Sequence, residues 1–494
     1  MKYQRIVMLS WVLSLLLWFP ISGKAQDLKS NYVDHTELPK GVIGEVVQKL
    51  IAVVNANDSI KIKEFVLGSF NEEFQRMAPM KAHQNAFLNF YRQTGGISFH
   101  SVRNYLPAIP NETTVILKDE NYGSWQGLTL MLDNANNRIK GLRFSPARTP
   151  SDILGAKITE AQLLEQTRKL VENLCEKDLF SGTVLIAKNE QVLYEYACGE
   201  ASKRFHVKNN LDTKFNLGSM NKMFTATAIM QLVERGKLNL TDPIDSYIDE
   251  SWLPQALTKQ ITVHHLLSHT SGLGSYFNDT YWNASRALYR SVEDFKPLVR
   301  GDTLSFTPGE RFGYSNTGML LLGAIIEKVT AVDYFDYISK NIYGPAKMLH
   351  TDSYEMNHPV ENLAIGYIPS DKNAYGWENN LYMHVIKGGP AGGGFSTVDD
   401  LHRFAMALKD EKLVSKNSLN LLWTKHSEGY GYGFSIREGT TGKIVGHGGG
   451  FPGLNSNLDI FLDTGYIVAV MSNYDGGASP LASKINNLID RLKN

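Results

Sequence analysis

Ser219 and Lys222 form a Ser-x-x-Lys sequence, and an apolar run follows directly from Met223 to Val233 and ends at Gly236. Apolar residues at helical spacing that end at a glycine predict a buried helix. Ser219 would lie at its N-terminus, with Lys222 one turn later on the same face. A free hydroxyl is a poor nucleophile at neutral pH, and an adjacent amine together with the helix dipole activates it. Alone the motif is weak, because a serine cap followed by a solvated lysine has the same sequence.

A second group of candidate residues is Tyr314-Ser315-Asn316, in a loop before a predicted helix over Met319–Val329. A loop tyrosine acts as a general base when nearby cations lower its pKa, and Lys222 is a suitable cation. Asn316 is a candidate for holding Lys222 and the amide of a substrate. The alternative is a buried aromatic ring beside a helix cap.

A third group is His447-Gly448-Gly449-Gly450, at the end of a predicted strand. Glycines at this place let a substrate carbonyl approach the edge strand. The backbone N–H groups of Ser219 and Gly450 would then form an oxyanion hole. His447 would bind a carboxylate or steer a proton, and the alternative is a surface histidine on a glycine turn.

The three motifs are Ser219-x-x-Lys222, Tyr314-x-Asn316 and His447-x-Gly449. Their order and spacing resemble those of the serine hydrolases related to class C β-lactamases and penicillin-binding proteins, over about residues 155–494. The resemblance implies that Ser219 forms an acyl-enzyme, that Lys222 and Tyr314 share the proton transfers, and that Asn316 orients the reacting groups. Water then releases the acid, and no metal or other cofactor is needed. Which of Lys222 and Tyr314 is the base stays open.

One motif departs from this family. Its β-lactamases and carboxypeptidases usually have Lys-Thr-Gly where this chain has His447-Gly448-Gly449, and that lysine and threonine help to bind the substrate carboxylate. The departure resembles the D-aminopeptidase-like and esterase-like branches. We therefore expect a peptidase or amidase for D-amino-acid or peptidoglycan-type substrates, ahead of a carboxylesterase and then a β-lactamase. The remaining alternatives are an acyltransferase and a non-catalytic module that binds wall fragments.

The hydrolase domain, expected over residues 151–494, has sheet-forming segments near both of its ends. The resemblance implies a β-lactamase-like α/β sandwich, in which an antiparallel sheet is interrupted by a large helical insert. We expect the helical insert over residues 240–425 and the active site in the cleft between the insert and the sheet. A helix is predicted over 159–177 and another over 479–491. The predicted strands are 182–187, 191–197, 431–436, 443–447, 457–461 and 466–472.

A separate domain is expected over residues 27–150, followed by a linker at 145–151. Helical spacing over 43–54 and 80–93 precedes a series of β-like segments. These segments are 97–105, 114–118, 127–132 and 138–144. Helices followed by a strand meander predict an α+β fold that resembles the cone-shaped NTF2-like domains. Because no convergent polar set is visible there, we expect an accessory role.

The N-terminal residues have the layout of a secretory signal peptide that is cleaved after Ala25. Lys2 and Arg5 precede an apolar run over Ile6–Phe19, which is short for a membrane-spanning helix. We therefore expect residues 1–25 to be removed and the mature protein to be periplasmic or extracellular, with no stable membrane anchor.

Composition limits the remaining classes. The 494 residues are 43% apolar and 20% charged, which suits a globular protein of two or more domains. Lys+Arg and Asp+Glu both number 50, so no strong field indicates nucleic acid, and a small acyl or peptide substrate is the expected partner. Cys175 and Cys198 lack metal-ligand spacing and either pair in an exported protein or remain as buried thiols. The oligomeric state stays open.

Overall fold

The computed structural model of the chain describes residues 31–108, 112–153, 157–370 and 372–493. The described residues form two compact units that divide between Lys157 and Ile158, later than the linker predicted at 145–151. The signal peptide predicted over residues 1–25 lies outside the described residues. No helix within the described ranges combines the length and the apolar character needed to cross a bilayer.

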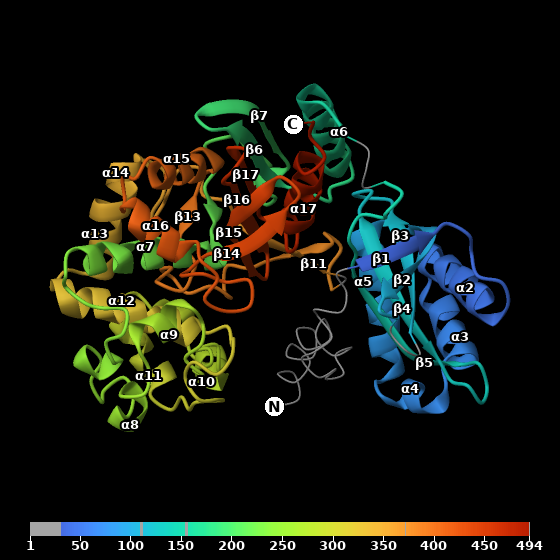
Figure 1. Cartoon of the computed structure of the whole chain (residues 1–494), viewed down its shortest axis with the longest axis horizontal. Coiled ribbons are helices and arrows are strands. Elements are labelled where there is room, and N and C mark those ends of the chain that lie inside the picture. The colour runs from blue at the N-terminus through green and yellow to red at the C-terminus, as the bar shows by residue number, and fades with distance from the viewer. Residues whose placement is uncertain (1–30, 109–111, 154–156, 371, 494) are drawn as a thin grey trace. The chain divides into compact units, whose positions relative to one another are not determined.

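The first unit is an α+β fold with one antiparallel sheet (Figure 1). Its strands lie side by side in chain order: β1 Asn31–His35, β2 Ile97–Leu106, β3 Thr113–Asp119, β4 Trp125–Leu132 and β5 Ile139–Pro146. Its helices are α2 Val42–Ala56, α3 Ser59–Ser69, α4 Glu72–Arg76 and α5 Met80–Thr94. Apolar residues of α2, α3 and α5 pack against those of β3 and β4 in a common core. Helices before a strand meander therefore confirm the predicted element order, and the NTF2-like likeness stays a prediction.

The sequence analysis missed β1, α3 and α4. β1 has no alternation of apolar residues, and a buried ion pair holds it to β2: Arg103 Nε donates to Asp34 Oδ1 at 2.8 Å, from directly opposite positions. A second nitrogen of Arg103 donates to Arg148 O. A strand stabilised by a contact 69 residues away leaves no local signal in the sequence.

The second unit contains a six-stranded antiparallel sheet in the order β14-β15-β16-β17-β6-β7. The strands are β6 Gly182–Lys188, β7 Gln191–Cys198, β14 Ser435–Gly439, β15 Gly442–Phe451, β16 Leu454–Phe461 and β17 Tyr466–Ser472. The sheet thus joins a hairpin near residue 182 to strands after residue 430, as predicted. β14 begins later than predicted, because Gly431 N–H bonds back to Phe434 O in a turn.

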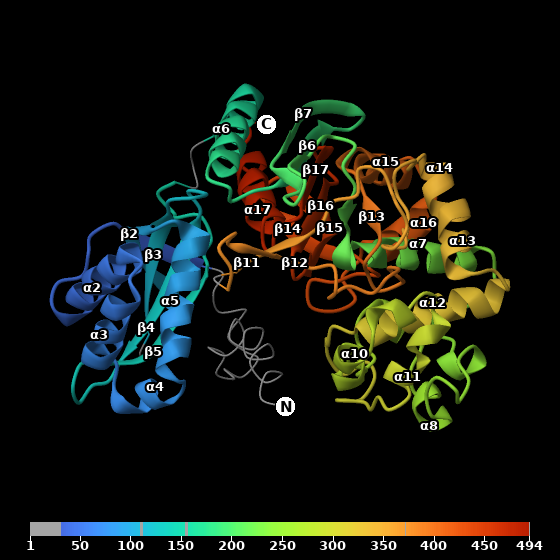
Figure 2. The ribbon, with the colours of Figure 1, turned by 180° about the vertical axis from the view of Figure 1, so that it is seen from behind.

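Helices cover both faces of this sheet (Figure 2). α6 Glu160–Glu176 and α17 Ala478–Ile489 contact one face, and α15 Val398–Lys409 contacts the other. Every residue of β17 is buried, which is the pattern of a strand that is enclosed on both sides. The two helices and the sandwich architecture agree with the predictions.

A mainly helical insert connects β7 to β14, as expected. Its α-helices are α7 Asn221–Glu234, α8 Gln255–Thr258, α9 Val263–Leu267, α10 Asp279–Asn283, α11 Lys296–Val299, α12 Asn316–Thr330, α13 Tyr334–Ile338, α14 Gly344–Ala346, α15 and α16 Lys416–Leu422. Short turns of other helix types are η2 Gly218–Met220, η3 Ile244–Ser246, η4 Arg286–Leu288, η5 Glu293–Phe295 and η6 Ser339–Tyr343. Short strands, which were not predicted, are β8 Glu200–Ser202, β9 Val207–Lys208, β10 Phe215–Asn216, β11 Tyr367–Pro369, β12 Trp377–Asn379 and β13 Phe395–Ser396.

Helix α7 is the centre of this unit. Every residue from Asn221 to Leu232 is buried, so the helix is enclosed on all sides, in agreement with the buried helix predicted after Ser219. It shares a core with α12 and α15, and with β6, β16 and β17 of the sheet. Both cartoon views show it between the sheet and α12 (Figures 1 and 2). A helix fixed on every side can position side chains at its N-terminus precisely.

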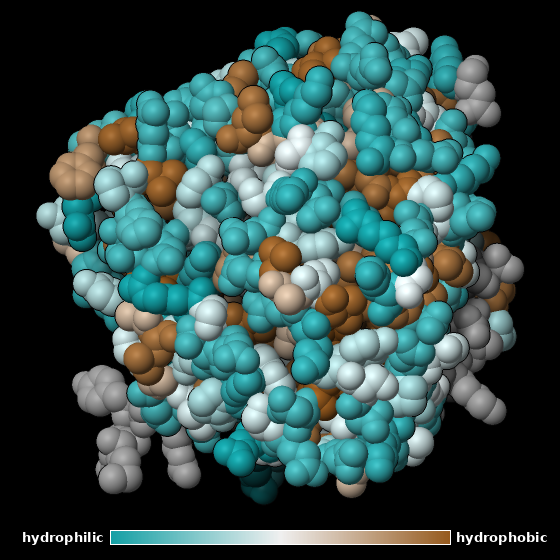
Figure 3. Space-filling model, turned by 90° about the vertical axis from the view of Figure 1, so that its left-hand side faces the viewer, coloured by the Kyte–Doolittle hydropathy of each residue, from teal (hydrophilic) through white to brown (hydrophobic). Residues whose placement is uncertain are grey.

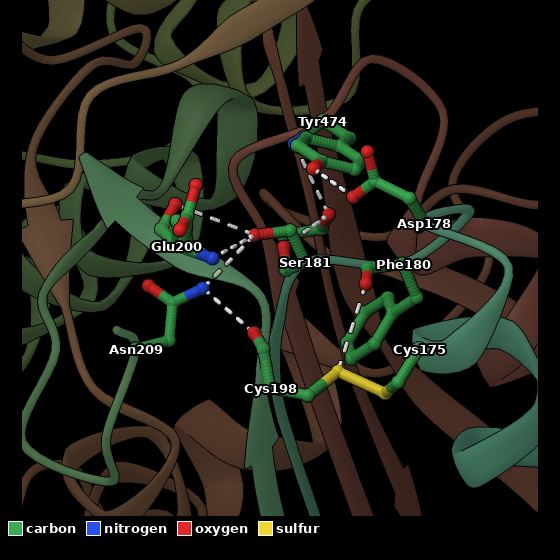
Figure 4. Close-up of a disulfide and its surroundings, with 9 residues drawn as sticks. Cys175, Asp178, Phe180, Ser181, Cys198, Glu200, Asn209 and Tyr474 are labelled. Carbon is green, nitrogen blue, oxygen red and sulfur yellow. Dashed lines mark hydrogen bonds between the residues drawn. A yellow bond between two sulfur atoms is a disulfide. The ribbon is translucent and has the colours of Figure 1, made fainter. Parts of the chain in front are cut away.

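Cys175 and Cys198 form a disulfide, which decides between the two alternatives left open by the sequence (Figure 4). The bond joins the last turn of α6 to the end of β7, an edge strand of the sheet. Asn209 Nδ2 donates to Cys198 O at 2.8 Å and to Ser181 Oγ at 3.0 Å, which holds the following segment against the same strand.

We predict that reduction of this disulfide lowers the free energy of unfolding of the hydrolase unit by about 3 kcal/mol, because a closed loop restricts the unfolded chain. Chemical denaturation with and without reductant measures the change. A Cys175→Ala/Cys198→Ala variant is the control, since it contains no cysteine and its midpoint should ignore the reductant. The prediction would be contradicted if the reductant shifted the denaturation midpoints of both proteins equally, or if it left the midpoint of the wild type unchanged.

Candidate active site

Ser219 lies in the turn η2, directly before α7. Two neighbours hold this turn by its backbone: Leu217 N–H donates to Gly394 O at 2.7 Å, and Gly393 N–H donates to Gly218 O at 3.1 Å. From the sheet, Ser456 Oγ donates to Leu217 O at 2.7 Å. The glycine-rich segment and the sheet therefore hold the serine from two sides.

Lys222, the second residue of α7, is fully buried. Its Nζ donates to Asn316 Oδ1 at 2.9 Å and to Ala391 O at 2.5 Å, and both acceptors are uncharged. Burial disfavours the ammonium form and lowers the pKa of Lys222 to about 7. A neutral amine has two N–H groups, so these two acceptors leave its lone pair unused. Such an amine can accept a proton at neutral pH.

Tyr314 contacts both members of the Ser-x-x-Lys motif. The Ser219 side chain lies near enough to the Tyr314 hydroxyl to lower its pKa, and Lys222 Nζ lies 4.9 Å from the centre of the Tyr314 ring. Although 41% of the residue is exposed, desolvation of its hydroxyl outweighs the effect of Ser219 and raises the pKa of Tyr314. The sequence hypothesis had Lys222 lowering this pKa. The structure differs because burial outweighs any effect of the lysine.

Asn316 begins α12 and links the lysine to a second loop. Its Oδ1 accepts from Lys222, and its Nδ2 donates to Ser275 Oγ at 3.1 Å. Ser315 caps the helix by accepting from Gly318 N–H at 2.8 Å. The expected contact between Asn316 and Lys222 is therefore present.

His447 was predicted to lie at the end of a strand. It lies inside β15 instead, because β15 continues through the glycines to Phe451. β14 pairs with β15 only as far as Gly446, so the rest of that edge has no partner from β14. Gly439 and Gly442 flank a two-residue turn and exchange backbone hydrogen bonds, and every second residue of β15 from Gly442 therefore faces this edge. Gly448 and Gly450 thus direct their N–H and C=O groups at the open edge.

Glycine is required where β15 meets the serine turn. A Cβ at Gly449 would lie 2.0 Å from Leu217 O and 2.3 Å from Ser456 Oγ. A Cβ at Gly218 would lie 3.0 Å from Gly450 N. The N–H of Gly450 is therefore close to the serine turn, in a position suited to an oxyanion hole with the N–H of Ser219.

His447 has both ring nitrogens engaged. Nδ1 lies 2.5 Å from Gly448 O, which can only accept, so Nδ1 carries the proton. Nε2 then accepts from the hydroxyl of Tyr430 at 2.9 Å. Burial, with the nearby Lys222, lowers the pKa of His447 to about 3, so the ring is neutral. A neutral ring without a free N–H cannot bind a carboxylate as the sequence had suggested.

Two further residues complete the site. Tyr430, which the sequence analysis did not select, donates to His447, and its ring lies 4.7 Å from that of His269. The ring of His269 is fully buried 4.3 Å from that of Tyr314, and its Nδ1 accepts from Ser315 N–H at 3.2 Å. His269 thus supports the loop that carries Tyr314. Tyr430 lies among glycines, and nothing in its local sequence indicates a partner.

A cavity of about 720 Å³ lies at the other end of α7, beside the C-terminus of α12. Its lining includes Arg235, Tyr337 and Lys340. Figure 3 shows the side of the molecule that carries α12 and α13, where hydrophilic residues surround small groups of apolar ones. This cavity is separate from Ser219. Across the described ranges, no cluster of His, Cys, Asp or Glu could hold a metal ion.

The family model described as β-lactamase matches residues 161–491. The chain belongs to this family. It is 32% identical to penicillin-binding protein 4* of Bacillus subtilis over 324 residues, which cover 62% of this chain and 70% of the relative. A penicillin-binding protein structure from Bacillus halodurans has a TM-score of 0.60 at 31% identity and covers 64% of this chain and 98% of its own. The D-stereospecific amidohydrolase of a Streptomyces species has a TM-score of 0.55 at 26% identity, over 65% of this chain and 97% of its own.

The chain is thus a β-lactamase-related serine hydrolase, as the motifs predicted. The family match begins after the first unit and includes every predicted site residue, from Ser219 to Gly450. The structure brings Ser219, Lys222, Tyr314 and Asn316 together, with Gly449 and Gly450 beside them. Their individual roles in catalysis are taken up below.

We predict that Gly449→Ala slows the reaction of Ser219 by about 100-fold, because the new Cβ must push the serine turn away from β15. Gly450→Ala is the matched control: its Cβ meets only Asn455 Nδ2, at 3.9 Å, and the N–H is kept, so the rate should stay within about threefold. The rate of labelling by a serine-directed fluorophosphonate measures both, with thermal unfolding as a check on folding. Equal rates in the two variants would refute this account.

Proposed function

We propose that this protein is an exported serine amidase or peptidase that forms an acyl-enzyme on Ser219, with a carboxylesterase as the second candidate. One observation carries the proposal: Ser219 lies one turn before Lys222 and beside Tyr314, and Lys222 is a buried amine whose pKa is lowered to about 7. An amine that is largely neutral near pH 7 is suited to activate a serine.

In the proposed reaction, Ser219 Oγ attacks the carbonyl carbon of the substrate, and its proton passes to the lone pair of Lys222. Tyr314 is protonated at neutral pH, and its hydroxyl relays the proton from Ser219 to Lys222. The backbone N–H groups of Ser219 and Gly450 hold the oxyanion. The C–N or C–O bond then breaks, the leaving group takes the proton, and water hydrolyses the acyl-enzyme by the reverse transfers. Lys222 is the base in this scheme because burial lowers its pKa and raises that of Tyr314.

The state of His447 narrows the substrate class. Neutral and held by Tyr430 and Gly448, it gives the site no cation for a substrate carboxylate. Carboxypeptidase and β-lactamase substrates carry such a carboxylate, so amides and esters without one are favoured. The likeness to a D-stereospecific amidohydrolase supports amides with D-amino-acid acyl groups as the first substrates to test.

Export is part of the proposal. The Cys175–Cys198 disulfide suits an oxidising compartment, and the residues up to Ala25 have the layout of a signal peptide. For the first unit we propose an accessory role. An acyltransferase differs only in using an amine or alcohol in place of water, and a non-catalytic binding module would have no need of an activated Ser219.

We predict a single adduct when the protein reacts with a fluorophosphonate and its intact mass is measured. Ser219→Ala should show no adduct. Ser251→Ala should react like the wild type, because the hydroxyl of this exposed serine bonds to the Asp249 carboxylate and not to an amine that could activate it. A folded wild-type protein that stays unlabelled would favour the binding-module alternative, and an adduct on Ser219→Ala would assign the nucleophile elsewhere.

The pH dependence tests the base. Because the neutral form of Lys222 is the active one, kcat/KM for an amide or ester should rise as the pH increases through about 7 and then level off. His447 stays neutral across this range, so His447→Gln should leave the apparent pKa of this rise in place. A rise that disappears in His447→Gln would assign the titration to the histidine and contradict the scheme.

A further inference from the structure

Beyond Gly450, the open edge of β15 ends in a group of aromatic side chains. Phe451 is the last residue of the strand, and its ring lies 5.6 Å from that of Phe277 and 6.3 Å from that of Trp282. The rings of Trp282 and Phe451 are parallel within 5°, and Phe277 lies 6.2 Å from Trp282. We call Phe277, Trp282 and Phe451 the aromatic ledge.

The aromatic ledge is connected to the catalytic groups from two directions. Along β15, side chains alternate between the faces of the sheet, and Gly449 faces the serine turn, so Phe451 lies on that same face. From the helical insert, Ser275 accepts a hydrogen bond from Asn316, and Phe277 N–H donates to Ser275 Oγ at 3.4 Å. Phe451 is two residues after Gly449. Phe277 is two residues after Ser275, the hydrogen-bond partner of Asn316.

The direction of a bound substrate follows from the pairing of β15. A chain that takes the place left by β14 runs antiparallel to β15, in line with β14. In such a pair, the residue opposite Gly450 both accepts its N–H and donates to its C=O. If Gly450 N–H holds the reacting carbonyl, the leaving group lies toward His447. The group attached to the amino side of the acyl residue then lies toward Phe451.

The ledge is partly exposed, as a binding surface must be. Trp282 keeps 37% of its surface exposed, although its ring stacks on Phe451 and its Nε1 donates to Phe277 O at 3.2 Å. The ring of His384 lies 5.0 Å from Phe451 on another side, and its burial lowers the pKa of His384 to about 4, so it adds no charge. The surface beyond Gly450 is therefore mainly aromatic, with the guanidinium carbon of Arg286 5.3 Å from the centre of the Trp282 ring.

We propose that the aromatic ledge binds an aromatic or bulky apolar group on the amino side of the acyl residue, and so selects substrates that carry one. The inference rests on the proposed function, since it places the acyl-enzyme on Ser219. It assigns Trp282 as the main contact, because Trp282 is the most exposed of the three residues and an aromatic ring gains from stacking with a second ring.

Two fluorophosphonates of matched length test the proposal, one ending in a phenyl group and one in a methyl group. Their labelling rates depend on the activated serine and not on the leaving group of a natural substrate. We expect the wild type to react about tenfold faster with the phenyl probe. In Trp282→Ala this ratio should fall toward one. Trp282→Leu keeps an apolar neighbour for Phe277 and Phe451, so it guards against misfolding of the alanine variant. Its rate ratio should lie between those of the wild type and Trp282→Ala.

Phe205→Ala is the control, since Phe205 is an aromatic residue of the same unit that is 71% exposed in the turn between β8 and β9. Both of its rates should equal those of the wild type. A wild-type ratio near one, an unchanged ratio in Trp282→Ala, or an equal loss of both rates in that variant would overturn the ledge as a specificity site. Absence of labelling by either probe in the folded wild type would instead overturn the proposed function, and the inference with it.

Discussion

The burial of the Lys222 amine is the constraint on which the rest of the site depends. Removing a lysine ammonium from water costs free energy, so burial favours the neutral amine and lowers the pKa of Lys222. Two neutral oxygen atoms accept hydrogen bonds from the buried amine. The acceptors come from α12 and from the segment before β13. Both must therefore be in place around α7 before the amine can be buried, and the complete enclosure of α7 by the sheet and the insert achieves this.

A second constraint is the distance between the serine turn and β15. The two backbones approach so closely that Gly449 has no room for a side chain. This contact brings the N–H of Gly450 to the serine without any side chain as a donor. Because the Gly431–Phe434 turn ends the pairing of β14 at Gly446, the edge of β15 beside this contact has no partner from β14.

Much of this architecture could be predicted from the sequence, because its signals are local. Alternating or continuous apolar segments located the six strands of the sheet, and the motifs around Ser219, Tyr314 and His447 indicated the family. The misses depend on distant contacts. Glycines have low strand propensity, so β15 was expected to stop at His447, whereas pairing with β16 continues it to Phe451. Likewise, the neutral state of His447 depends on its burial and on the nearby Lys222, and β1 depends on Arg103.

The protonation states of Lys222, Tyr314 and His447 determine which substrate charges the site can accept. The pKa of Lys222 lies close to neutrality, while Tyr314 keeps its proton and His447 stays uncharged. A charged substrate would have to bury its charge beside an amine that is only half protonated and beside aromatic rings. Recognition by backbone pairing along β15 and by apolar contact at its end avoids that cost. The proposed preference for uncharged acyl groups thus has the same physical origin as the lowered pKa of Lys222, namely the burial of the site.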